Sequence, residues 1–87
     1  MRELTIETYL IKCVKELGGE CRKVKWVGRK GAPDRLVMLP NVSFWVELKA
    51  TGEKTKPHQL REHSRMRAMG LQVEIIDSIE RVAEVLA

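Results

Sequence analysis

The sequence predicts a mixed α/β protein in which one mixed sheet is flanked by helices, in the order α-β-β-β-α-β-α. Apolar residues recur at helical spacing in three segments, four shorter segments have the apolar or alternating pattern of strands, and glycine or proline marks the boundaries. The helix expected between the third and fourth strands is a crossover, so we expect those strands to run parallel as neighbours. The length of 87 residues is that of one small domain, residues 1–87.

The first helix is expected at residues 4–17, because Ile6, Leu10, Val14 and Leu17 recur on one face. Two consecutive glycines then end the pattern. Glu7 lies beside this apolar stripe.

The first strand is expected at residues 20–27, where apolar residues alternate in part, and a basic turn follows at residues 28–31. The second and third strands are expected at residues 35–39 and 43–50, joined by a turn at Pro40-Asn41. These strands form a meander before the crossover helix.

Side chains alternate along the third strand, so Trp45, Glu47 and Lys49 are expected on one face and the apolar residues between them on the other. Glu47 and Lys49 are therefore neighbours. Asp34 stands at the mouth of the preceding strand, and its carboxylate can approach Glu47 once the two strands pair.

The loop at residues 51–56 is polar and contains glycine. A second helix is expected from Pro57, which suits a first helical turn, to Gly70, which suits a helix end. A last strand at residues 71–76 and a final helix capped by Asp77 or Ser78 complete the chain.

The composition is that of a globular protein, with 44% hydrophobic and 32% charged residues. No apolar run approaches the roughly 18 residues of a membrane span, and the N-terminus has no signal-like core, so we expect a cytoplasmic protein. Cys13 and Cys21 lack the spacing of a zinc site and are too few for a disulfide scaffold, so we expect both to be reduced packing residues.

The charge is unevenly distributed along the chain. Residues 18–35 contain six basic against two acidic residues, and residues 52–70 contain five against two. Residues 71–87 reverse this, with four acidic residues against one basic. A polyanion would be drawn to the first two segments, although a solvated basic surface has the same composition.

The Pro33-Asp34 pair followed by Glu47-Leu48-Lys49 resembles the signature of the PD-(D/E)XK nuclease superfamily. The run at residues 28–36, the segment at residues 44–50, and a helix with Gln59 before its closing glycine are similar to the VRR-Nuc branch. The resemblance spans nearly the whole chain and implies a restriction-endonuclease-like core. It also implies a nuclease that uses Mg²⁺ or Mn²⁺.

The resemblance assigns roles to individual residues. Asp34, Glu47 and the main-chain carbonyl of Leu48 are expected to hold the cation, because Mg²⁺ prefers oxygen ligands. Lys49 is expected to orient the attacking water. Glu7 would reach the metal from the first helix, the alternative being an exposed surface acid.

Gln59 resembles the glutamine that the family carries on the helix after the catalytic strand. On a helical wheel it shares a face with His63, toward the sheet, and we expect Lys49 or a metal-bound water as its partner. The alternative is that Gln59 caps its own helix. For the set of Asp34, Glu47 and Lys49, the alternative is a salt bridge at the edge of a strand.

The candidates for DNA contact are basic residues that flank the site: Arg29, Lys30, Arg35, Lys56, Arg61 and Arg65. Surface solubility explains any one of them equally well. His58 and His63 are five residues apart, which is not the spacing of a helical zinc site, so we expect them to be structural or close to phosphate. Trp26 and Trp45 suit packing in the core or a dimer better than base stacking.

The sequence thus favours a metal-dependent, structure-selective DNA endonuclease, with resolution of four-way (Holliday) junctions by a homodimer as the specific hypothesis. Small stand-alone nucleases of this kind resemble phage or mobile-element genes. Two alternatives stay open: a less selective nuclease acting on flaps, nicks or single strands, and a DNA-binding module without catalytic activity.

Overall fold

The computed structural model describes all residues, 1–87, and has the predicted order of elements. The elements are α1 (Glu3–Glu16), β1 (Glu20–Lys23), β2 (Arg35–Met38), β3 (Ser43–Leu48), α2 (Pro57–Ala68), β4 (Val73–Ile76) and α3 (Ile79–Leu86). The ends of the three helices differ from prediction by one or two residues, which is the usual fraying of helix termini.

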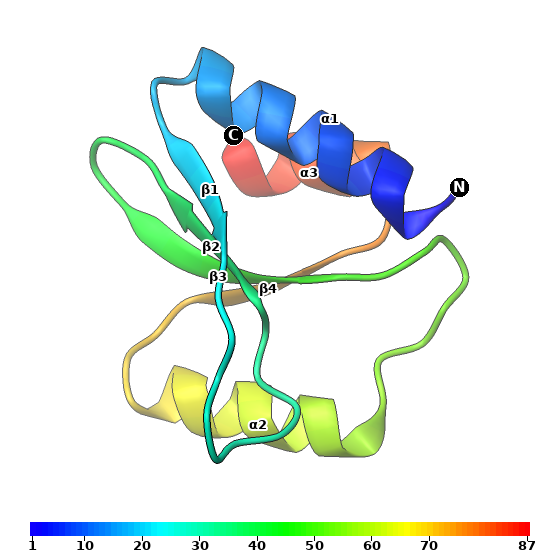
Figure 1. Ribbon diagram of the computed structural model, residues 1–87, viewed down its shortest axis with the longest axis vertical. Helices are drawn as coiled ribbons and strands as arrows, with labels where there is room; N and C mark the ends of the chain where they lie inside the picture. Colours follow the sequence, from blue (N-terminus) through cyan, green and yellow to red (C-terminus); the bar gives the residue numbers. More distant parts are fainter.

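The four strands form one mixed sheet in the order β1-β2-β3-β4. β1 and β3 both pair antiparallel with β2, and β3 pairs parallel with β4 after the α2 crossover, as the sequence predicts. Figure 1 shows α1 and α3 together on one face of the sheet and α2 alone on the other. The sheet therefore has one apolar face under two helices and a second face that a single helix covers.

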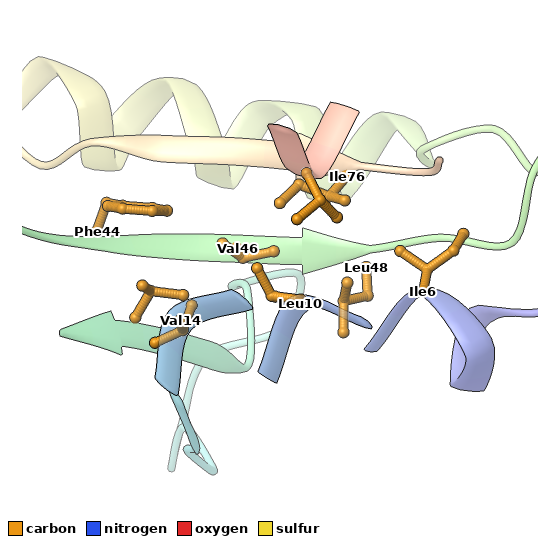
Figure 2. Packing of buried hydrophobic residues seen from close by; sticks show 9 residues of the cluster. Ile6, Leu10, Val14, Phe44, Val46, Leu48 and Ile76 are labelled. Carbon is orange, nitrogen blue, oxygen red and sulfur yellow. The ribbon is translucent and has the colours of Figure 1, made fainter. Parts of the chain in front are cut away.

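The core lies between the sheet and the α1–α3 pair. Figure 2 shows Phe44, Val46 and Leu48 along β3 packing with Leu10 and Val14 of α1. Nine residues form this cluster, all on the side opposite Glu47 and Lys49. The predicted alternation of β3 is thus confirmed, and the packing of the core fixes which way the acid and the amine of this strand point.

The prediction of a first strand at residues 20–27 is wrong, because β1 ends at Lys23. The last backbone hydrogen bond to the second strand's side runs from Val24 N to Asp34 O. The next pair in this register, Lys25 with Pro33, is a non-hydrogen-bonded pair, and no further ladder hydrogen bond forms beyond it. The chain leaves the sheet there and descends beside α2 (Figure 1), and Val27, expected in the strand, is 93% exposed.

The predicted strands 43–50 and 71–76 are also shorter in the structure, which ends β3 at Leu48 and begins β4 at Val73. The outer border of β4 is covered by two arginine side chains. Arg67 of α2 donates to the carbonyl of Val73, at 2.7 Å from its Nη2, and Arg81 of α3 donates to the carbonyl of Ile75, at 3.1 Å from its Nε. None of the helices is long and apolar enough to cross a membrane.

Candidate active site

The pairing of β2 with β3 brings the two acids of the predicted signature together. The last pair of the ladder is Arg35 with Val46, and one step further in the same register places Asp34 across from Glu47. Side chains of directly opposed residues point to the same face of a sheet. Both carboxylates therefore belong to the face that α2 covers, at the edge where β2 begins.

The charges of Lys49 and Asp34 affect the ionisation of Glu47. Burial raises the pKa of Glu47 to about 7, because the surrounding protein disfavours the ionised carboxylate. The positive charge of Lys49 opposes this shift, whereas the negative charge of Asp34 adds to it. Two acids held near each other, one of them largely withdrawn from water, form a site that favours a compensating cation.

Lys49 is on the same face as Glu47 and is buried, with 7% of its surface exposed. It forms no ion pair within 4.0 Å, unlike Arg29, Arg35 and Arg65. Its ammonium group is therefore available to a substrate or a water molecule. The alternative interpretation, a salt bridge at the edge of a strand among Asp34, Glu47 and Lys49, does not form at that distance.

His63 of α2 meets the same carboxylate from the opposite side. Its Nε2 lies 3.3 Å from Glu47 Oε1, and the imidazole is fully buried. Burial lowers the pKa of His63, and the charge of Arg67 lowers it further, which favours the neutral ring. When Glu47 is ionised its carboxylate can only accept, so His63 then donates its Nε2–H to Glu47, and Nδ1, which has no partner, is left as the acceptor.

Glu7 does not join Asp34 and Glu47 directly. Its Oε2 accepts from Arg35 Nη2 at 2.7 Å, and Arg35 Nη1 lies 2.9 Å from Asp34 Oδ1. Glu7 is half-buried and points toward the sheet, so the alternative of an exposed surface acid is wrong. Arg35 thus links the acid of α1 to the acid at the start of β2.

The prediction that Arg35 contacts DNA is contradicted by the same geometry. Its side chain is only 9% exposed, and its guanidinium is already held by two carboxylates. A contact with a phosphate would require this buried arrangement to open. Arg35 is an internal counter-ion of the acids.

The donors of the site fit a hard divalent cation with an incomplete protein shell. Nowhere do three or more His, Cys, Asp or Glu side chains come together closely enough to hold a metal ion. Glu7 is therefore not a third carboxylate ligand beside Asp34 and Glu47. Asp34 and Glu47 supply carboxylate oxygens, and Leu48 lies at the same edge, beyond the last β2–β3 pair. Mg²⁺ accepts such a set because it keeps several of its waters.

Gln59 caps its own helix, which was the alternative interpretation of this residue. Its Oε1 accepts from the backbone N–H of Lys56 at 2.9 Å, which caps the first turn of α2. The expected approach to Lys49 is not made by this oxygen. A catalytic contact of Gln59 stays a prediction.

Four of the basic candidates converge on one pocket of about 440 Å³ beside α2. Its lining contains no hydrophobic residue and consists of Gly28, Arg29, Lys30, His58, Arg61 and Arg65. His58, Arg61 and Arg65 therefore lie on one face of α2. Lys56 is exposed at the start of α2 and does not line this pocket.

The two tryptophans pack against each other, with ring centroids 5.0 Å apart and planes inclined by 49°. Trp26 Nε1 donates to the carbonyl of Pro33 at 2.9 Å. These contacts agree with the expected packing role and brace the segment that delivers Asp34. Cys13 and Cys21 are free and partly buried, as predicted.

Sequence reasoning missed one contact and one residue of this region. It placed His63 on the face of the helix toward the sheet, which the buried Met66 shares, but not in contact with Glu47. Glu62 is also buried, but it stands among arginines and resembles an ordinary exposed helix residue. No pattern in the sequence distinguishes it.

Comparisons with known proteins agree with this geometry. No family model matches the sequence. The chain is 51% identical over 79 residues to "Putative nuclease p44" of Acyrthosiphon pisum secondary endosymbiont phage 1, covering 90% of this chain and 85% of that protein. A solved structure described as a VRR_NUC domain matches with a TM-score of 0.87 at 38% identity, covering 99% of this chain and 96% of the other. The chain therefore belongs to the VRR-Nuc family of PD-(D/E)XK nucleases.

Proposed function

We propose that this nuclease is a Mg²⁺-dependent or Mn²⁺-dependent endonuclease that hydrolyses phosphodiester bonds in branched DNA, with four-way junctions as its preferred substrate. The observation that carries the proposal is the alignment of Asp34 with Glu47 across β2 and β3, with Lys49 beside them and free of any ion pair. Asp34, Glu47 and the carbonyl of Leu48 would hold the cation. Bound there, a divalent ion supplies charge compensation at the phosphate and lowers the pKa of a water.

The residues of the chain do the positioning. His63 donates to one oxygen of Glu47 and so orients the carboxylate toward the edge of the sheet. Lys49 would orient the attacking water and stabilise the negative charge that grows on the phosphate oxygens. Glu7 would act indirectly. It would hold Arg35, and Arg35 would fix the position of Asp34.

Branched DNA is the substrate that this surface suits. The cationic pocket offers contacts for phosphate, and the chain has little surface left with which to read a long base sequence. A junction presents strands at unusual angles that a small protein can recognise by shape and backbone. Cutting two strands of one junction requires two active sites, which a symmetric homodimer provides. Such an enzyme would act inside a bacterial cell, on the DNA of a phage or its host.

The experiment compares cleavage of a four-way junction, a flap, a nicked duplex and a single strand in Mg²⁺, in Mn²⁺ and in EDTA. Wild-type protein should cut the junction fastest, and only with metal. Glu47→Ala should bind the junction but cut it at least about 10³-fold more slowly. Glu84→Ala, which removes an exposed acid of α3, is the matched control and should cut like wild type.

Three results would overturn parts of the proposal. Wild-type protein that binds DNA but cuts nothing in either metal is a binding module. Equal cleavage of flaps, nicks and single strands indicates a less selective nuclease. A monomer in analytical ultracentrifugation, both free and on the junction, contradicts the homodimer.

A further inference from the structure

The cationic pocket beside α2 is built by two segments that are distant in sequence. Residues 28–30 contribute one wall, and His58, Arg61 and Arg65 on successive turns of α2 contribute the other. Arg29, Lys30, Arg61 and Arg65 carry four positive charges, and no acidic side chain lines the space. Like charges repel one another, so a pocket of this kind needs something that holds its arginines in place.

Glu62 holds two arginines of the pocket in place. It is 5% exposed and does not line the pocket, yet its Oε1 lies 2.7 Å from Arg65 Nη2 and its Oε2 lies 3.7 Å from Arg29 Nε. Both arginines are more than half exposed beyond this contact. One buried carboxylate thus anchors the inner side of two guanidinium groups whose outer sides face the pocket.

The loop is fastened to α2 at a second point. Gly31 has φ +84, and a Cβ atom built there would lie 2.9 Å from the carbonyl oxygen of His58 and 3.0 Å from its ring. Only glycine permits this close approach of the loop to the backbone of the helix. Residues 28–30 are therefore held against α2 at two points, by the close approach of Gly31 and by the Arg29–Glu62 pair.

The pocket is continuous with the region of the catalytic acids. A neighbouring pocket of about 430 Å³ is lined by Lys23, Lys25, Trp26 and Asp34 among others, and Arg29 lines both. A strand that places a phosphate at Asp34 can therefore pass along basic side chains to the pocket beside α2. Arg29 stands where the two spaces join.

We propose that the pocket of Gly28, Arg29, Lys30, His58, Arg61 and Arg65 is a preformed subsite for a second phosphodiester of the DNA strand being cut, and that Glu62 is the residue that positions Arg29 and Arg65 within it. The inference rests on the proposed function in its choice of ligand, since DNA supplies the phosphodiester. It adds a defined place for that group and a residue that organises it. Contacts prepared before binding lose less conformational entropy when the ligand arrives.

A charge-neutralising substitution separates positioning from simple electrostatic attraction. Glu62→Gln raises the net charge by one, so a diffuse basic surface would bind DNA more tightly. Loss of the anchor should instead weaken binding, by roughly tenfold. Glu84→Gln is the matched control, because Glu84 also pairs with an arginine three residues away, Arg81, but is exposed on α3. It should bind no more weakly than wild type.

Binding is measured by fluorescence anisotropy of a labelled four-way junction in EDTA, at several salt concentrations. Circular dichroism checks that each variant is folded. Arg61→Gln provides a second measurement that leaves the Glu62 ion pairs intact, and it should reduce the slope of log K against log salt by about 1. Lys15→Gln, on the exposed surface of α1, removes the same charge and should leave the slope unchanged.

The outcomes separate this inference from the proposed function. Binding by Glu62→Gln that equals or exceeds wild type overturns the positioning role. A salt slope for Arg61→Gln equal to that of Lys15→Gln overturns the subsite. Failure of wild-type protein to cut DNA in Mg²⁺ or Mn²⁺ would overturn the nuclease mechanism but would leave these binding results to stand by themselves.

Discussion

His63 Nε2 lies 3.3 Å from Glu47 Oε1, and this contact joins α2 to the strand that carries the nuclease signature. It is the one hydrogen bond that a side chain of α2 makes to an acid of the sheet. The orientation of Glu47, a candidate metal ligand, therefore depends on the position of α2 against the sheet.

Replacing His63 with Phe should weaken Mg²⁺ binding by about 10-fold or more, because Glu47 loses the donor that orients it. His63→Gln retains an N–H near the same place and should recover part of that affinity. Metal binding is read from the rise in melting temperature with Mg²⁺ concentration, independently of cleavage. Met66→Leu conserves the packing volume of the same helix face and is the control. Equal metal affinity in the Phe variant and wild type would exclude the positioning role.

Replacing Glu47 with Gln should stabilise the metal-free protein at high pH. The folded pKa of Glu47, about 7, is above its ordinary value of 4.5, so the native state favours the protonated acid. Stability is lost as the pH rises from about 4.5 through 7 and the buried group ionises. The advantage of Glu47→Gln should be near zero at pH 4 and on the order of 2–3 kcal/mol at pH 8.

Urea unfolding in EDTA at pH 4, 6 and 8 measures this difference. Glu16→Gln changes an exposed acid of α1 and should show no such trend. A difference between Glu47→Gln and wild type that stays constant with pH would mean that folding does not raise the pKa of Glu47.

Mg²⁺ should raise the melting temperature of wild-type protein, and more strongly at pH 8 than at pH 6. Binding to the native state alone adds stability, and at ten times the Kd the rise should be about 5–10 °C for a domain of this size. The pH dependence follows because Glu47 must lose its proton before it can bind a cation. Asp34→Asn and Glu47→Gln should each abolish the rise. A rise in melting temperature that persists in both variants would mean that the cation binds elsewhere.

Arg35→Met should destabilise the fold by about 3 kcal/mol, because it leaves the half-buried Glu7 and its neighbour Asp34 without their counter-ion. Adding Glu7→Gln to this variant should restore part of the loss. Arg22→Gln breaks an exposed pair with Glu20 and should change stability by less than about 1 kcal/mol. Thermal unfolding compares the four proteins, and equal effects of Arg35→Met and Arg22→Gln would show that burial adds nothing.

The sequence was sufficient for those parts of the site that follow from local periodicity. Alternation along β3 placed Glu47 with Lys49, and the short link between β2 and β3 implied that Asp34 would oppose Glu47. The end of β1 was missed because it depends on where the partner strand stops pairing, and strand length is a property of the pair.

Partners of polar side chains were harder to predict than their positions. Glu7 was expected at the metal, but Arg35 competes for it, and only the packed structure shows which group is nearer. Gln59 had two available partners and bonds to Lys56 of its own helix. Glu62 and Arg65 have the spacing of an ordinary surface pair. Nothing in that spacing reveals that the acid is buried beneath a loop whose Arg29 is 33 residues away along the chain.

Arg67 and Arg81 have a consequence for how copies of this chain can associate. By occupying the outward carbonyls of Val73 and Ile75, they close one side of the sheet to strand addition. β1, at the other side, has no such cover. Endless strand-to-strand growth requires two open sheet edges on each molecule, so pairing through β1 alone would stop at two copies.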